Sequence, residues 1–155
     1  MVWGCLSANG RGNLVNVNGI MKKEDYIKIL EQNIRQSAEK LGLGTQWIFQ
    51  QDNDPKHTAK VVKKLLAENN INVLEWPSQS RDLNPIENLW RELKTRVMVR
   101  KPSNLKYLEI YARKEWSKKR LTSVMKKKRL CHWLLRNGMN NCTNEMFCQN
   151  VKKRR

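Results

Sequence analysis

The chain has 155 residues, a hydrophobic fraction of 39% and six Trp, which suffices for one domain with a core and excludes a disordered tail. No run is long enough to span a bilayer, and the start lacks a signal-peptide pattern, so we expect a soluble intracellular protein with reduced cysteines. Its formal charge is +17 and uneven: residues 1–75 hold ten Lys or Arg against eight Asp or Glu, and residues 76–155 hold 21 against six. This asymmetry predicts a polyanionic partner such as nucleic acid, although a solvated basic face or a nuclear address has the same composition.

The first half of the chain predicts a hairpin, a helix and a buried strand. Residues 1–20 predict two paired strands, an apolar one in M-V-W-G-C-L-S and one with alternating apolar residues in L-V-N-V-N-G, on either side of the turn sequence A-N-G-R-G-N. Residues 22–41 place apolar side chains at steps of three and four, which predicts a helix that ends at L-G-L-G. Residues 47–50 are typical of a short buried strand.

The second half alternates helices with a further strand. Asp54 and Pro55 are expected to begin a helix that runs to Leu66, with Asp54 as its N-cap. A strand over residues 71–76 follows, then a helix from Asn84-Pro85 and another over residues 104–119. The remainder is basic and weakly periodic. Strands alternating with helices predict an α/β sandwich whose later strands run parallel.

Two carboxylates stand where such a fold forms its sites. Asp52 follows the strand that ends at Gln50, and Glu87 lies in the first turn of the helix after the next strand. Both could reach one sheet edge and hold a divalent cation through hard oxygen ligands. Structural roles explain them as well, because Asn84 and Glu87 fit a capping box and Asp52 fits an Asx turn.

Other polar residues permit weaker hypotheses. Asn53 and His57 are possible supporting residues of the same site, with His57 touching a phosphate or the outer shell of a metal. His57 is explained equally well as a surface histidine at a helix start. The cysteines include no C-x-x-C pair, so incidental thiols are favoured over a zinc site.

Two long motifs resemble the catalytic domain of Tc/mariner DNA transposases. They are F-Q-Q-D-N-D-P-K-H-T-A and L-E-W-P-S-Q-S-R-D-L-N-P-I-E-N-L-W, and the likeness runs from Met1 to about Trp116. The resemblance implies an RNase H-like fold in which two Asp and one Glu bind two Mg²⁺ or Mn²⁺ ions. Asp52 matches the second Asp and Glu87 matches the Glu, with the 34 intervening residues found in the Tc branch.

The first Asp of the family has no counterpart in this chain. In the family it lies on a central strand upstream of the hairpin that begins here with V-W-G-C. We therefore expect an incomplete α/β, RNase H-like fold with a mixed sheet of about four strands and its first, central strand missing. Either strand 1–6 closes onto strand 47–50, or a gap remains. Residues 1–116 would form the partial catalytic domain and residues 117–155 a basic helical or irregular tail.

The resemblance implies a fragment of a DNA transposase catalytic domain, whose family reaction is metal-dependent DNA cleavage and strand transfer. Because one metal ligand is absent, we expect this chain to be inactive by itself. The expected partners are DNA and a second copy or a full-length transposase, with no membrane, and the expected location is the nucleus. The alternatives are a non-catalytic basic module that binds nucleic acid or dimerises, and a relic gene product.

Overall fold

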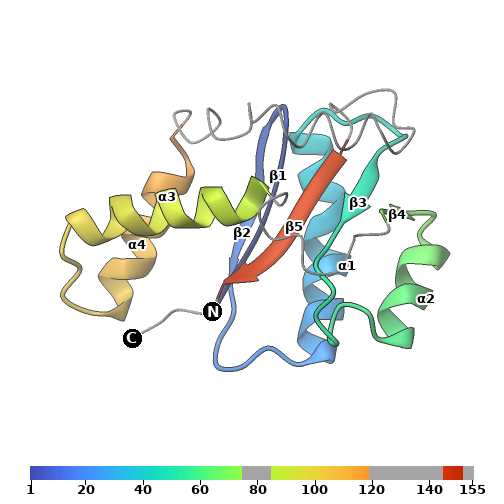
Figure 1. The fold of residues 1–155 in the computed structure, drawn as a ribbon, viewed down its shortest axis with the longest axis horizontal. Coiled ribbons are helices and arrows are strands. Elements are labelled where there is room, and N and C mark those ends of the chain that lie inside the picture. The colour runs from blue at the N-terminus through green and yellow to red at the C-terminus, as the bar shows by residue number, and fades with distance from the viewer. Residues whose placement is uncertain (75–84, 119–144, 152–155) are drawn as a thin grey trace.

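The computed structural model describes residues 1–74, 85–118 and 145–151, which form a mixed sheet flanked by helices (Figure 1). After an initial hairpin, helices and strands alternate as far as α3, which is followed by a second helix and a last strand. The elements are β1 (Val2–Ser7), β2 (Gly10–Asn16), α1 (Lys23–Lys40), β3 (Ile48–Gln50), α2 (Lys60–Glu68), β4 (Asn72–Val73), α3 (Pro85–Val99), α4 (Leu105–Trp116) and β5 (Glu145–Val151).

The sheet has five strands in the order β2-β1-β5-β3-β4. β1 pairs antiparallel with β2 on one side and with β5 on the other. β5 and β4 both run parallel to β3. Figure 1 shows β5, the red arrow, crossing the middle of the sheet between β1 and β3.

The expected sheet of four strands is therefore wrong by one strand. β1 does not close onto β3, and no gap separates them, because residues 145–151 from the predicted tail lie between them. The segment E-M-F-C-Q-N-V alternates in the way a central strand needs: Met146 and Cys148 enter one core and Phe147 enters the other. All three side chains are buried, so β5 joins the two faces of the sheet.

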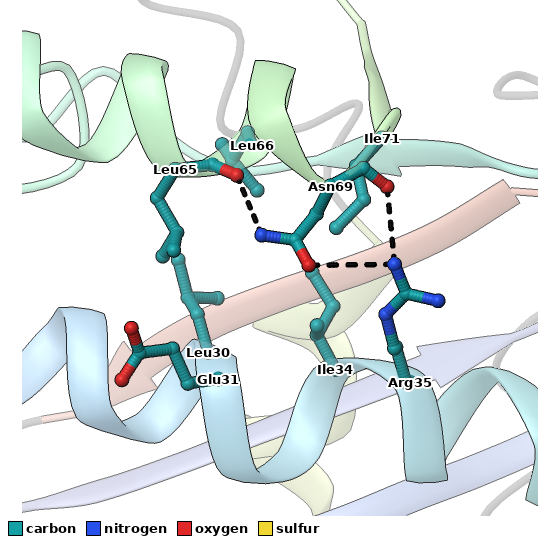
Figure 2. Close-up of a pocket in the computed structure, with 8 residues that line it drawn as sticks. All are labelled: Leu30, Glu31, Ile34, Arg35, Leu65, Leu66, Asn69 and Ile71. Atoms are coloured by element: carbon teal, nitrogen blue, oxygen red, sulfur yellow. Dashed lines mark hydrogen bonds between the residues drawn. The ribbon is translucent and has the colours of Figure 1, made fainter.

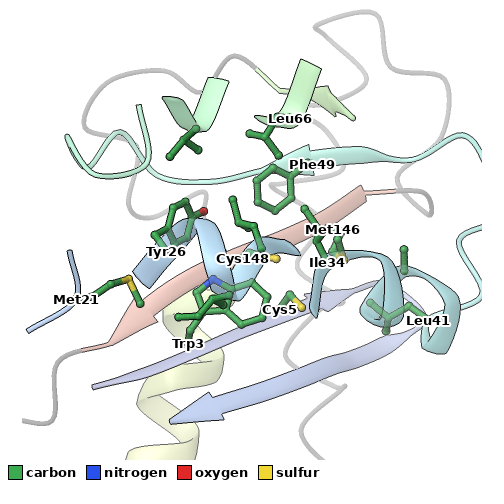
Figure 3. Close-up of a cluster of buried hydrophobic side chains, with 14 of the residues drawn as sticks. Trp3, Cys5, Met21, Tyr26, Ile34, Leu41, Phe49, Leu66, Met146 and Cys148 are labelled. Atoms are coloured by element: carbon green, nitrogen blue, oxygen red, sulfur yellow. The ribbon is translucent and has the colours of Figure 1, made fainter. Parts of the chain in front are cut away.

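Helices cover both faces of the sheet, which gives three layers. α1 and α2 pack on one face, where the core of Figure 3 gathers side chains from β1, β3, β5 and both helices, including Trp3, Tyr26, Phe49, Leu66 and Met146. α3 and α4 pack on the other face, over a core that includes Val2, Leu6, Leu89, Trp90, Trp116 and Phe147. Within the described residues, no helix is long and apolar enough to cross a membrane.

The predicted helix over residues 22–41 is confirmed as α1. Its apolar positions face the core, and the backbone N–H of Lys22 donates to the carboxylate of Asp25 at 2.9 Å, which satisfies one free donor at the helix start. α4 begins as predicted too: the side chain of Asn104 accepts from the backbone N–H of Tyr107 at 3.0 Å.

A buried carboxylate fixes α4 to the end of α3. Glu115 in α4 accepts from Arg100 at 2.5 Å and from Lys118 at 2.7 Å, and only 3% of its side chain is exposed. Close by, the indole rings of Trp90 and Trp116 stack with centroids 5.2 Å apart, and the Trp116 Nε1–H donates to the carbonyl of Gly12 at 3.1 Å. These contacts hold the helical layer against the hairpin.

Candidate active site around Asp52

The predicted site residues lie in two parts of the chain, the segment between β3 and α2 and the start of α3. Asp52 follows β3 by two residues, Asn53 is exposed beside it, and His57 lies in a turn before α2. Glu87 lies in the first turn of α3, where it is partly buried. Asp52 and His57 are in direct contact.

The expected start of the second helix is wrong. α2 begins at Lys60 after Ala59, and Asp54 does not cap it. The Asp54 carboxylate instead accepts from the backbone N–H of Lys56 at 3.0 Å and from its ammonium at 2.6 Å, and the Asp54 carbonyl accepts from the N–H of His57 at 2.8 Å. Short-range acceptance by an Asp side chain competes with helix formation. The result is a tight turn that presents His57 to Asp52.

His57 is buried, contrary to its interpretation as a surface histidine. Its side chain is 1% exposed, whereas that of Asp52 is 34% exposed. Nδ1 of His57 donates to the carboxylate of Asp52, since an ionised carboxylate can only accept. The His57 ring lies against the ring of Tyr26, with centroids 4.1 Å apart, so it cannot swing away from Asp52 without losing that packing.

A chain of hydrogen bonds ties this pair to α1. The Tyr26 hydroxyl donates to the side-chain oxygen of Gln51 at 2.8 Å, and the Gln51 amide donates to the carbonyl of His57 at 3.1 Å. The residue just before Asp52 is thereby fixed to α1 and to the turn. The end of β3 is a rigid platform for the carboxylate.

Sequence reasoning missed Tyr26 and Gln51. Tyr26 read as one more apolar position on the inner face of α1. A signal for Gln51 was available: strand alternation puts it on the same side as Phe49, and a polar residue at a core position needs a partner.

Asp52 is charged at neutral pH. Burial would raise its pKa, but the hydrogen bond from His57 and the electrostatic interaction with it outweigh burial, so the pKa of Asp52 is lowered. Burial, followed by nearby negative groups, holds the pKa of Tyr26 well above its ordinary value. The Tyr26 hydroxyl therefore keeps its proton and can donate to Gln51.

The donor set fits a divalent cation only in part. An ionised, partly exposed carboxylate suits Mg²⁺, and the buried side-chain oxygen of Gln50, two residues before Asp52, has no hydrogen-bond partner. Against this, the described residues contain no group of three or more His, Cys, Asp or Glu that could hold a metal ion. Within those residues, Asp52 and Glu87 are therefore not part of a cluster of three such ligands.

A small hollow between α1 and α2 is separate from this site. About 20 Å³ in volume, it has room for a water molecule but not for a substrate (Figure 2). Arg35 spans it by donating to the carbonyl and the side-chain oxygen of Asn69, both at 3.3 Å. None of the candidate site residues lines it.

Comparisons with known proteins define the class. The sequence model of the DDE superfamily endonuclease family matches residues 1–109, and the chain belongs to this family. It is 48% identical to the Tcb1 transposase of Caenorhabditis briggsae and 43% identical to the Tc1 transposase of Caenorhabditis elegans, each over 104 residues, or 67% of this chain. The chain matches 38% of the length of each relative.

The fold has a solved counterpart. The catalytic domain of Mos1 mariner transposase matches 91% of this chain and 70% of its own length, with a TM-score of 0.63 at 20% identity. The expected α/β, RNase H-like fold class is thus confirmed. The family resemblance of the two sequence motifs is confirmed as well.

Proposed function

We propose that this chain carries part of the active site of a DNA transposase, a protein that cuts DNA and joins strands. The observation that carries the proposal is the ionised Asp52 carboxylate, held at the end of β3 by a buried His57, in a chain 43–48% identical to Tc1-type transposases. Fixing a carboxylate before substrate arrives is what phosphoryl transfer requires of a protein.

Asp52 and Glu87 are the metal-binding carboxylates in this proposal, with Mg²⁺ or Mn²⁺ as the cation. A cation held there would stabilise charge on the phosphate oxygens. His57 orients Asp52 and shares its negative charge, and Asn53, which is exposed next to Asp52, is a supporting residue. Two carboxylates make fewer ligands than a two-ion site needs.

We further propose that the chain is inactive by itself. Gln50 of β3 pairs with Phe147 of β5, and the same register extended past the end of β3 would bring position 149, a Gln, next to position 52. The single acid of β5 is Glu145, which pairs with Ile48 at the far end of β3. The strand next to Asp52 therefore offers no carboxylate at the level of Asp52.

Nicking and strand joining on duplex DNA with Mn²⁺ test both parts. We expect no activity beyond that of Asp52→Asn. Mn²⁺ binding, followed by electron paramagnetic resonance, should be weak and weaker still in Asp52→Asn and Glu87→Gln. Glu68→Gln is the matched control, because Glu68 is an exposed acid of α2 that pairs with Lys64. If the native chain nicks DNA and both site variants lose this activity, the proposed inactivity is wrong. If neither variant changes Mn²⁺ binding, Asp52 and Glu87 are not the metal ligands.

A non-catalytic role is the second candidate, and the charge of +17 favours it. Exposed basic residues of the helical layer include Lys94, Lys106, Arg113 and Lys114. Such a module would bind DNA through phosphates, in the nucleus, as a homodimer or beside a full-length transposase. Its affinity should fall steeply with salt and be unchanged by Asp52→Asn. A DNA affinity that does not change with salt concentration would contradict this second candidate.

A further inference from the structure

Two cysteines face each other across the centre of the sheet. Cys5 of β1 and Cys148 of β5 are direct partners in the antiparallel register. Both thiols are free, both are 0% exposed, and both lie in the core under α1 (Figure 3). Directly opposed residues of antiparallel strands have Cα atoms about 4.5–5.5 Å apart, inside the range of about 4.4–6.8 Å that a disulfide needs.

The surroundings of the two sulfurs differ. Burial would raise the pKa of the Cys5 thiol, but hydrogen bonds from Cys148 and from the Ser37 hydroxyl outweigh it, and the pKa is lowered. Burial raises the pKa of Cys148. Cys5 is therefore the better nucleophile of the pair, since the thiolate is the reacting form.

We propose that Cys5 and Cys148 are a redox site, which a low-molecular-weight disulfide such as oxidised glutathione converts into a cross-strand disulfide that fastens β5 into the sheet. The site is independent of the metal-binding carboxylates. It belongs to a strand that enters both cores, so the bond controls whether the whole sheet can open.

The reaction has two exchange steps. The Cys5 thiolate attacks one sulfur of oxidised glutathione, forms a mixed disulfide and releases one glutathione thiolate. The Cys148 thiolate then attacks the Cys5 sulfur, forms the protein disulfide and releases the second glutathione. Two protein thiols are oxidised, one glutathione disulfide is reduced to two glutathiones, and the two thiol protons pass to the leaving thiolates.

Burial sets the order of events. Because neither thiol is exposed, glutathione disulfide reaches Cys5 only when β5 leaves its place. The second step occurs when β5 returns, because the docked strand is what brings Cys148 opposite Cys5. Oxidation should thus be slow in the folded chain and specific for this pair.

The test uses the full chain in mixtures of reduced and oxidised glutathione. After trapping with iodoacetamide, cleavage by trypsin and a Glu-specific protease separates Cys148 from Cys142, and mass spectrometry maps every pairing. We expect a Cys5–Cys148 disulfide within monomers, reversed by dithiothreitol, with a Tm about 5–15 °C higher than in the reduced chain. Cys148→Ser should abolish this gain.

In the variant Cys131→Ser/Cys142→Ser, Cys5 and Cys148 are the only cysteines, so no other pairing can form. If that variant fails to fold, the disulfide map of the unaltered chain decides the question. Three results would overturn the proposal: Cys5 and Cys148 staying reduced in the folded chain at all ratios, Cys5 pairing with Cys131 or Cys142 instead, or a Cys5–Cys148 bond found only between two chains.

Discussion

Asp52 and Glu115 are two acids with different surroundings. Glu115 lies between Arg100 and Lys118 with 3% of its side chain exposed, so its charge is neutralised inside the protein. Asp52 accepts a hydrogen bond from the His57 imidazole, and 34% of its side chain is exposed. Both pKa values are lowered. Lys118 and Arg100 lower the pKa of Glu115, and His57 lowers the pKa of Asp52 although burial would raise it. A lowered pKa therefore does not mark a functional acid; the partners and the exposure do.

The region around Asp52 and the region around Glu115 both pack against β5. β5 sends Phe147 toward the helical layer that holds Glu115, and Met146 and Cys148 toward the layer that holds Tyr26 and His57. Damage to β5 should disturb both regions, whereas damage to either acid should stay local. The following changes separate these effects.

Phe147→Ala should have the largest effect. Phe147 is 1% exposed in a central strand, and removing such a ring costs about 3–5 kcal/mol. Urea unfolding followed by circular dichroism measures the loss. Val99→Ala is the control, because Val99 is 76% exposed and should change stability by less than about 0.5 kcal/mol. An equally small effect at Phe147 would show that β5 is not in the sheet.

Glu115→Gln should rank second. It leaves two cations without their charged acceptor, which costs about 1.5–3 kcal/mol. Glu68→Gln is the matched control, because its pair with Lys64 is exposed and worth less than about 1 kcal/mol. Equal losses in the two variants would contradict the structural role of Glu115.

The pH dependence of Glu115 has a definite sign. Lys118 foremost, and then Arg100, lower the pKa of Glu115 in the folded chain below its ordinary value of 4.5. Its contribution to stability is present above pH 4.5 and is lost as pH falls through the lower folded pKa. The difference in unfolding free energy between the native chain and Glu115→Gln should shrink in that window, as urea unfolding at successive pH values would show.

Tyr26→Phe should cost less, about 1–2 kcal/mol, because one buried hydrogen bond to Gln51 is lost and its acceptor is left without that donor. Stability by urea unfolding should fall while the Arg100–Glu115 region keeps its pH dependence. Tyr107→Phe, at an exposed position of α4, is the control. A shift in the acid limb of unfolding in Tyr26→Phe would mean the two regions are coupled.

Gln50→Met should have the smallest effect on stability. The buried Gln50 oxygen has no hydrogen-bond partner, whereas its amide nitrogen donates to the Gln51 carbonyl at 3.0 Å. An apolar side chain of similar length removes the first penalty and loses the second bond, so the net change in stability should be less than about 1 kcal/mol. Calorimetry gives the stability, and electron paramagnetic resonance gives the Mn²⁺ affinity. Reduced Mn²⁺ binding at unchanged stability would make Gln50 part of the Asp52 site.

Local signals predicted most of the fold. The 3- and 4-residue apolar steps of α1 and the turn sequence of the hairpin each depend on near neighbours, and each is confirmed. β5 could not be predicted in this way. Its pairing partners lie about a hundred or more residues away, and its seven residues stand in a basic stretch without clear periodicity.

For the site, too, local features could be predicted from the sequence and long-range contacts could not. Asp52 could be placed after its strand because the strand and its end are local features. The burial of His57 depends on Tyr26 from α1, a contact across 31 positions that no spacing in the motif reveals. The helix predicted from Asp54-Pro55 was displaced because the carboxylate of Asp54 engages Lys56.

Hydrogen exchange of residues 145–151 in the native chain, read by mass spectrometry, tests the central claim that β5 completes the sheet. A strand paired on both sides should exchange as slowly as β1, since both open only with the sheet. Exchange of this segment at the rate of unprotected amides, with β1 still protected, would contradict the claim.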